Sequence, residues 1–196
     1  MRGVRQMMER GSQGVALHSD ERFNRTVERI ASEAFWLRTY QAAINGMRVE
    51  AVGLDFFRVS LNALKDARLI RMIRVLEDDS ETASFWYLLR CNGPLIDRAA
   101  RKAGLDLAEL KQIAARLRGI RNKTFVHIDK DGVFDPQQYY RDASLTNDKV
   151  AKFCDRLWET MKDVYLSVHG KELEHDVYSG EDIKVLARLR DEAESA

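Results

Sequence analysis

Proline, cysteine and long apolar runs are all scarce in this sequence. Its 196 residues include two prolines and two cysteines, and the longest runs without a charged residue, 11–19 and 39–47, are nine residues each. A membrane-spanning helix needs about 20 mostly apolar residues, and the first twenty residues lack the apolar stretch of a secretory signal. We therefore expect a protein without a membrane span that acts in the cytoplasm.

Signals for metal or cofactor binding are also missing. Cys91 and Cys154 are too few and too far apart for a disulfide framework or a zinc site, so we expect reduced thiols. His18, His169 and His175 have no partner at metal-ligand spacing. The sequence contains no Walker loop, dinucleotide-binding glycine pattern, metalloprotease motif or serine-hydrolase elbow. It therefore predicts neither a metal nor a cofactor.

Charge is unevenly distributed along the chain, although the net charge is only +1. Residues 98–130 hold nine Lys or Arg against three Asp or Glu, a balance of +6, whereas residues 131–196 hold nine against fifteen, a balance of −6. A basic segment of this kind is compatible with contact to a polyanion, but charge alone favours the simpler interpretation of a solvated helix face paired with an acidic neighbour.

Apolar residues recur every three or four positions along most of the chain, which is the helical period. We expect an all-α protein: a flexible lead-in over 1–18, a helical domain with four to five long helices and several short ones over 19–170, and a linker with a charged, thinly packed helix over 171–196. The predicted helices cover 20–45, 48–76, 85–90, 95–103, 106–125, 147–168 and 180–192. Ser19 would cap the first, and a break near Lys65-Asp66 would divide the second.

The helix over 106–125 carries the most informative residues. Asp106 followed by Glu109 has the spacing of a capping box. With about 100° per residue, Arg121 falls within about 20° of Leu110, in the middle of the apolar stripe. A buried arginine needs an anionic partner, or a cleft that such a partner can enter. His127 follows on the same side of the helix, so the two side chains could grip one phosphodiester and move a proton.

These residues form a recognisable segment, Arg121-Asn122-Lys123-Thr124-Phe125-Val126-His127, in which a polar residue follows the arginine and five positions separate it from the histidine. The segment resembles the signature of the HEPN superfamily. His127-Ile128-Asp129 is similar to the ending common in its abortive-infection branch, and residues 83–89 also resemble a segment of that branch. The resemblance covers roughly residues 20–168.

The resemblance implies an HEPN-like helical bundle in which two copies form one RNA-cleaving site that needs no metal and uses the RNA 2′-hydroxyl as nucleophile. In that site Arg121 would hold the phosphate, His127 would act as general acid or base, and Asn122 would orient the group or the RNA. We expect further contacts to the RNA backbone, or simply solvated helix ends, at Lys123, Arg118, Arg116 and Lys130.

Three functions stay open at this point. The first is a homodimeric endoribonuclease that acts as a toxin or phage-defence effector, restrained by an antitoxin or another regulatory partner. The second is a non-catalytic interaction module, in which Arg121 pairs with a carboxylate such as Asp129 or Asp135 and His127 closes the helix end. The third is an RNA-binding regulator that does not cut.

Two other groups of residues have simpler expected roles. Arg68, Arg71 and Arg74 recur every three residues, and we expect this ridge to face solvent rather than RNA. We expect the larger aromatic side chains to lie in the core or in a dimer interface rather than to stack on bases; they are Phe35, Trp36, Phe85, Trp86, Trp158 and Tyr165.

Overall fold

A computed structural model describes residues 3–47, 55–122, 144–175 and 178–194, and these residues form seven helices and no strand. The helices are α1 (Gly3–Gly46), α2 (Asp55–Leu76), α3 (Phe85–Cys91), α4 (Gly93–Ala103), α5 (Leu107–Ile120), α7 (Asn147–His169) and α8 (Glu181–Glu194). The prediction of an all-α bundle is confirmed. None of the helices in these ranges has the length and apolarity that crossing a membrane requires.

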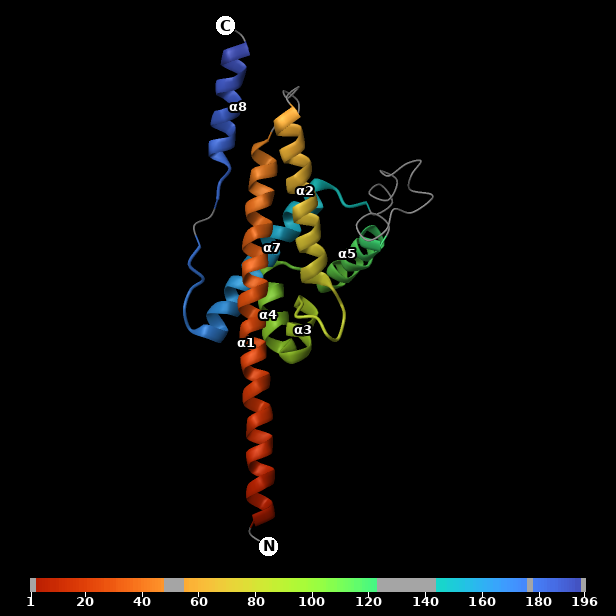
Figure 1. Ribbon diagram of the computed structural model, residues 1–196, viewed down its shortest axis with the longest axis vertical. Coiled ribbons are helices and arrows are strands. Elements are labelled where there is room, and N and C mark those ends of the chain that lie inside the picture. Colours follow the sequence, from red (N-terminus) through yellow and green to blue (C-terminus); the bar gives the residue numbers. More distant parts are fainter. Residues whose placement is uncertain (1–2, 48–54, 123–143, 176–177, 195–196) are drawn as a thin grey trace.

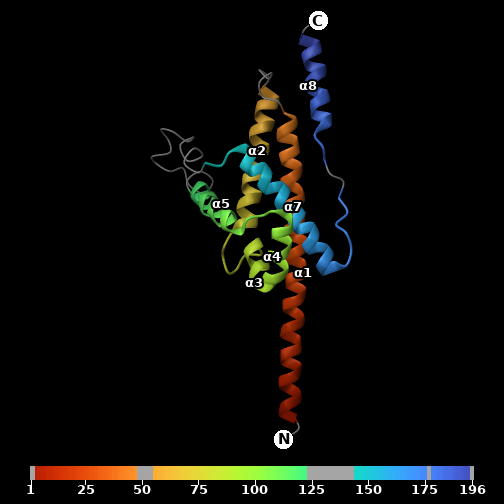
Figure 2. The same cartoon turned by 180° about the vertical axis from the view of Figure 1, so that it is seen from behind.

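Helix α1 is the axis of the molecule (Figure 1). Helix α2 runs antiparallel along its C-terminal half, α7 crosses it obliquely, and α4 packs against α7. The short helix α3 lies beside α4, while α5 lies on the outer side of α2. Seen from behind, the N-terminal part of α1 extends well beyond this bundle (Figure 2). Residues far apart in sequence therefore meet mainly along the C-terminal half of α1.

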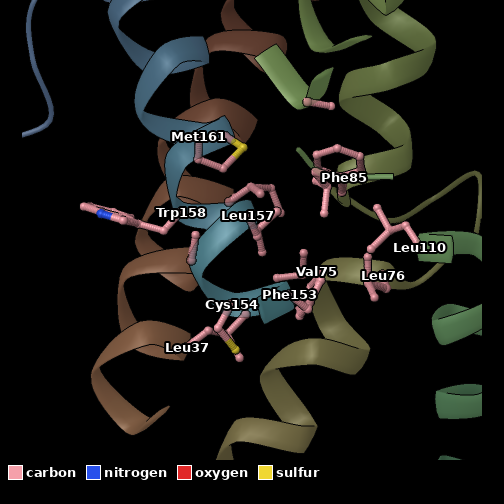
Figure 3. Close-up of a cluster of buried hydrophobic side chains, with 14 of the residues drawn as sticks. Leu37, Val75, Leu76, Phe85, Leu110, Phe153, Cys154, Leu157, Trp158 and Met161 are labelled. Atoms are coloured by element: carbon pink, nitrogen blue, oxygen red, sulfur yellow. The ribbon is translucent and has the colours of Figure 1, made fainter. Parts of the chain in front are cut away.

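The core lies where α7 faces α1, α2 and the short helices (Figure 3). Leu157 and Met161 of α7 are fully buried, and Phe85 of α3 and Leu110 of α5 close the other side. Each such side chain contributes about 1.5–3 kcal/mol when it leaves water. Apolar residues that recur every three or four positions are buried along both helices, at Val27, Ile30, Ala34, Leu37 and Ile44 of α1 and at Val150, Phe153, Leu157, Met161 and Val164 of α7.

Side-chain caps fix where several helices begin. Ser84 caps α3, Asn92 caps α4 and Thr146 caps α7. At α5, Asp106 Oδ1 accepts hydrogen bonds from the backbone nitrogens of Ala108 and Glu109, at 2.8 and 3.3 Å. Such a cap supplies acceptors for N–H groups that have no partner inside the helix. The cap predicted at Asp106 is confirmed.

The structure corrects three details of the predicted helices. Helix α1 begins at Gly3, so Ser19 lies inside it and does not cap its start; the flexibility expected of residues 1–18 stays a prediction. Helix α2 continues without a break through Lys65-Asp66. The helical period also places Ala63 on the inward face of α2, but Ala63 is exposed. The predicted ends at 48–54 and 123–125 lie outside the described residues.

The last helix is held at its first turn and exposed beyond it. Gly180 has φ = 75°, and a Cβ added there would lie 2.7 Å from the Ala42 carbonyl oxygen. The backbone before α8 thus touches the C-terminal end of α1. Farther along, Val185, Leu186 and Leu189 are 42 to 56% exposed. The thin packing expected of this helix is confirmed.

Candidate functional site

Arg121 stands where the buried face of α5 ends. Leu117 and Ile120 are 1% and 2% exposed, and Arg121 directly follows as the C-cap, with its backbone N–H bonded to the carbonyls of Leu117 and Arg118. At residues 121–122 the backbone departs from the α-helix to a wider, π-helical geometry. The Arg121 side chain is 32% exposed. Its place in the apolar stripe predicts that Arg121 lies inside the core. The side chain instead lies at the border of the core.

The partner of Arg121 comes from a distant part of the chain. Its Nη1 donates to Oε2 of Glu77, the residue that follows α2, and its Nε donates to Asn122 Oδ1 at 3.1 Å. The Glu77 side chain is 21% exposed, so water reaches both members of the ion pair. The carboxylates suggested as examples for the interaction-module alternative, Asp129 and Asp135, lie outside the described residues.

A cavity of about 480 Å³ opens beside this ion pair. Its walls combine three arginines with two glutamates and a few small or apolar residues; the lining is Arg29, Ile30, Glu33, Ile73, Arg74, Glu77, Thr82, Ala83 and Arg121. Helices α1 and α2 and the end of α5 all contribute. The arginines outnumber the carboxylates, so a single anionic group could enter without facing a net negative wall.

Glu33 anchors the opposite wall of this cavity. Its side chain is 4% exposed, and it accepts from Arg29 Nη2 at 2.8 Å and from Arg71 Nη1 at 2.5 Å. The Arg71 guanidinium also lies over the rings of Trp36 and Tyr40, at 5.6 and 5.4 Å from their centroids. Burial works against the charged form of Arg71, but the hydrogen bonds with Glu33 and Tyr40 outweigh it and raise its pKa. The Glu33 carboxylate is therefore held in two ion pairs that support the fold, and it is not available as a catalytic base.

The expected solvent-facing ridge on α2 is wrong for two of its three arginines. Arg68 is only 8% exposed, and Arg71 pairs with Glu33. Only Arg74 is exposed. The three-residue spacing drifts around the helix by about 60° at each step, so the side chains do not share one surface. Side-chain amides of α1 and α7 hold Arg68 inward, and the Glu33 carboxylate holds Arg71 inward.

The other predicted site residues divide into described and undescribed ones. Asn122 and Arg118 are exposed and Arg116 is half-buried. On the helical wheel Arg118 lies about 60° from Arg121 and Arg116 about 140° away, so Arg118 is the better placed to share a ligand with Arg121. His127, Lys123 and Lys130 lie outside the described residues. Within the described ranges, no three His, Cys, Asp or Glu side chains gather as a metal site would require.

Comparison of the chain with protein-family models, with curated proteins and with solved structures finds no match. The site must therefore be judged on its own chemistry. Its described part is a half-exposed guanidinium, oriented by one carboxylate and one amide, at the edge of a cavity with excess positive charge.

Proposed function

We propose that the chain is a metal-independent endoribonuclease whose active site is shared by two copies. Arg121 binds the scissile phosphate, His127 transfers the proton to or from the 2′-hydroxyl or the leaving oxygen, and Asn122 orients Arg121. Arg118 and Arg116, with Lys123 and Lys130, contact the RNA backbone. A toxin or phage-defence effector restrained by a partner protein is the biological role that fits such an activity.

One observation carries the proposal. Arg121 is a permanently charged group at the end of a buried helix face, and it keeps 32% of its side chain in water beside a cavity instead of being sealed into the core. Partly exposed ion pairs contribute only about 0–1 kcal/mol to the stability of the fold. Stability alone is therefore a weak reason for an arginine at this position. A phosphate that enters the cavity can use the guanidinium edge that water now contacts.

The experiment is RNA cleavage by the purified full chain in EDTA. We expect 2′,3′-cyclic phosphate ends, because the 2′-hydroxyl attacks its own phosphate. Arg121→Ala and His127→Ala should each abolish cutting while the oligomer persists in size-exclusion chromatography. Arg98→Ala, which removes an exposed charge on α4, is the matched control and should cut normally. Cleavage that survives in both site variants contradicts the assignment.

A second candidate is a non-catalytic helical interaction module. It is favoured by the ion pair with Glu77, which already supplies Arg121 with an anionic partner inside one chain. In that case Arg121→Ala would lower the melting temperature or the affinity of the dimer, and the wild-type protein would cut no RNA at any salt concentration or pH. Binding of intact RNA that weakens with salt, without cutting, would instead indicate an RNA-binding regulator.

A further inference from the structure

One side of α1 combines exposed arginines with an exposed tryptophan. At about 100° per residue, six residues of this helix fall within a sector of about 80°. They form one stripe along the helix: Arg22, Arg25, Arg29, Glu33, Trp36 and Tyr40. Helix α2 runs beside the C-terminal part of this stripe (Figure 1) and adds Arg71 and Arg74 to it. We call these eight residues the basic-aromatic stripe.

The N-terminal half of the stripe carries positive charge that water still reaches. Arg22 is exposed, and the side chains of Arg25 and Arg29 are 76% and 62% exposed. Arg25 pairs with Glu21 and Arg29 pairs with Glu33, in each case across one turn of α1. Ion pairs with such exposed members are weak, because water and salt screen them. An anionic partner can therefore bring its own carboxylates to these arginines at little cost.

Trp36 is exposed and yet held in place at the other end of the stripe. It is 40% exposed, while the Phe35 ring meets it at a steep angle with 5.5 Å between centroids. The Tyr40 ring lies 5.9 Å away, and the Arg71 guanidinium lies over the indole. A large side chain that is already fixed loses little conformational entropy on binding. Trp, Tyr and Arg are also the residues most enriched at binding hot spots, so Trp36 is suited to anchor a partner.

We propose that the basic-aromatic stripe binds an acidic, amphipathic α-helix of a partner protein. Carboxylates on one face of that helix pair with Arg22, Arg25 and Arg29, and an apolar side chain farther along the same face packs against Trp36. Arginines at three- and four-residue spacing match carboxylates at the same spacing on a second helix, because both helices have the same period. The stripe is about 27 Å long at 1.5 Å per residue, which is the length of about five helical turns.

The aromatic end of the stripe favours a protein helix over RNA. The Arg71 guanidinium lies over one face of both rings, at 5.6 Å from the Trp36 centroid and 5.4 Å from the Tyr40 centroid. A nucleobase needs a free ring face on which to stack, whereas an aliphatic side chain can pack against an exposed ring edge. Docking of the helix does not depend on RNA cleavage at Arg121, although Arg29 and Arg74 also line the cavity beside that residue.

The test is fluorescence anisotropy with the full chain and two labelled helical peptides of about 18 residues, the length that spans the stripe. One peptide carries glutamates at three- and four-residue spacing in its N-terminal half and leucines on the same face in its C-terminal half. The other has the reverse order, so both helix directions are tested. In a control peptide the same residues are spread around the helix. We expect one of the two peptides to bind at least tenfold more tightly than the control. Binding of neither, or equal binding of the control, overturns the proposal.

Charge reversal assigns the surface. The double variant Arg22→Glu with Arg25→Glu should weaken peptide binding at least tenfold. A peptide with lysines in place of its glutamates should bind the double variant more tightly than it binds the wild type. Arg101→Glu reverses an exposed charge on α4 and should keep the wild-type affinity. Wild-type affinity in the double variant, or no gain with the lysine peptide, rejects the stripe as the binding surface.

Trp36→Ala separates the docking of a helix from simple attraction between opposite charges. We expect at least tenfold weaker peptide binding, because the apolar anchor is lost. Leu186→Ala truncates a 55% exposed side chain on α8 and should bind the peptide as the wild type does. Charge reversal keeps the proposal testable if Trp36→Ala does not fold, and wild-type affinity in a folded Trp36→Ala rejects it. A labelled single-stranded RNA that binds, and loses affinity on charge reversal while neither peptide binds, would assign the stripe to RNA instead.

Discussion

Arg121 at the end of α5 forms an ion pair with Glu77 directly after α2, and this pair joins two helix ends that are 44 residues apart in sequence. Glu77 has two opposing effects on the candidate site. It orients the guanidinium, and its negative charge competes with any phosphate for the same N–H groups. Which effect dominates can be measured, because the two depend on different properties of the side chain.

Glu77→Gln should tighten RNA binding. The amide oxygen of Gln can still accept from Arg121 Nη1, so the orientation is kept while the competing charge is lost. An ion pair of this exposure is worth about 1 kcal/mol, which corresponds to about a fivefold lower Kd. Fluorescence anisotropy with RNA in the catalytically silent His127→Ala background would measure it.

Glu81→Gln is the matched control for this prediction. Glu81 is an exposed carboxylate in the same loop, and its substitution removes the same charge at a greater distance from Arg121. We expect an effect on RNA affinity that is smaller and disappears at high salt, as for any screened surface charge. Equal effects of the two variants, or weaker RNA binding by Glu77→Gln, would show that the pair with Arg121 is not in competition with RNA.

The sequence predicted local features better than distant contacts. The cap at Asp106 follows from its spacing to Glu109, and the buried stripe of α5 follows from helical periodicity, so both depend on neighbouring residues. Periodicity placed Arg121 in the middle of that stripe, whereas its side chain is 32% exposed at the helix end. Glu77 could not be chosen, because periodicity says nothing about which helix ends meet. The sequence signal was present in the acidic run Glu77-Asp78-Asp79, but only the packing of α2 against α5 selects the first of the three.

The arginines of α2 show the same limit. A spacing of three residues suggested one exposed ridge, yet the partners that bury Arg68 and Arg71 come from other helices. The residues that flank Gln41 and Glu33 in sequence do not mark either one as the partner of a buried arginine. Their role becomes visible only once α1 and α2 lie antiparallel, as in Figure 1.

Arg71→Ala should destabilise the fold by about 3 kcal/mol, because it leaves the Glu33 carboxylate nearly buried with one of its two cationic partners. Arg74→Ala, one turn along α2 at an exposed position, should change the free energy of unfolding by less than about 0.5 kcal/mol. Urea unfolding measures both. In a Glu33→Gln background the cost of Arg71→Ala should fall by more than half, since the buried charge is gone. An unchanged cost would assign the effect to packing on Trp36 and Tyr40.

The two cysteines should differ in reactivity. Burial raises the pKa of the Cys154 thiol from 9.0 to about 12, whereas Cys91 is exposed. Since the thiolate is the reactive form, iodoacetamide should label Cys91 in the native protein and Cys154 only after unfolding. Mass spectrometry of the labelled peptides would show this. Native labelling of Cys154 at the rate of Cys91 would contradict its burial.

The same shift predicts a loss of stability at alkaline pH. The folded state resists deprotonation of Cys154 and the unfolded state does not, so this contribution is fully present below pH 9 and is lost as pH rises from 9 towards 12. Tyr178 adds a similar loss only above pH 10, because burial, with help from its hydrogen bond to Asp182, raises its pKa from 10.0 to about 12. Between pH 9 and 10, Cys154→Ala should therefore flatten the decline in urea midpoint, and Cys91→Ala should not.

Gly180→Ala should release α8 from the bundle. Gly180 has φ = 75° and Gly170 has φ = 67°, so an alanine is strained by about 1 kcal/mol at either position. Only at Gly180 would the new Cβ also meet backbone, 2.7 Å from the Ala42 carbonyl oxygen, whereas at Gly170 it would meet open space. Amide hydrogen exchange should therefore accelerate along α8 in Gly180→Ala and stay at the wild-type rate there in Gly170→Ala. Equal protection of α8 in the two variants would mean that the contact between Gly180 and α1 does not hold the last helix in place.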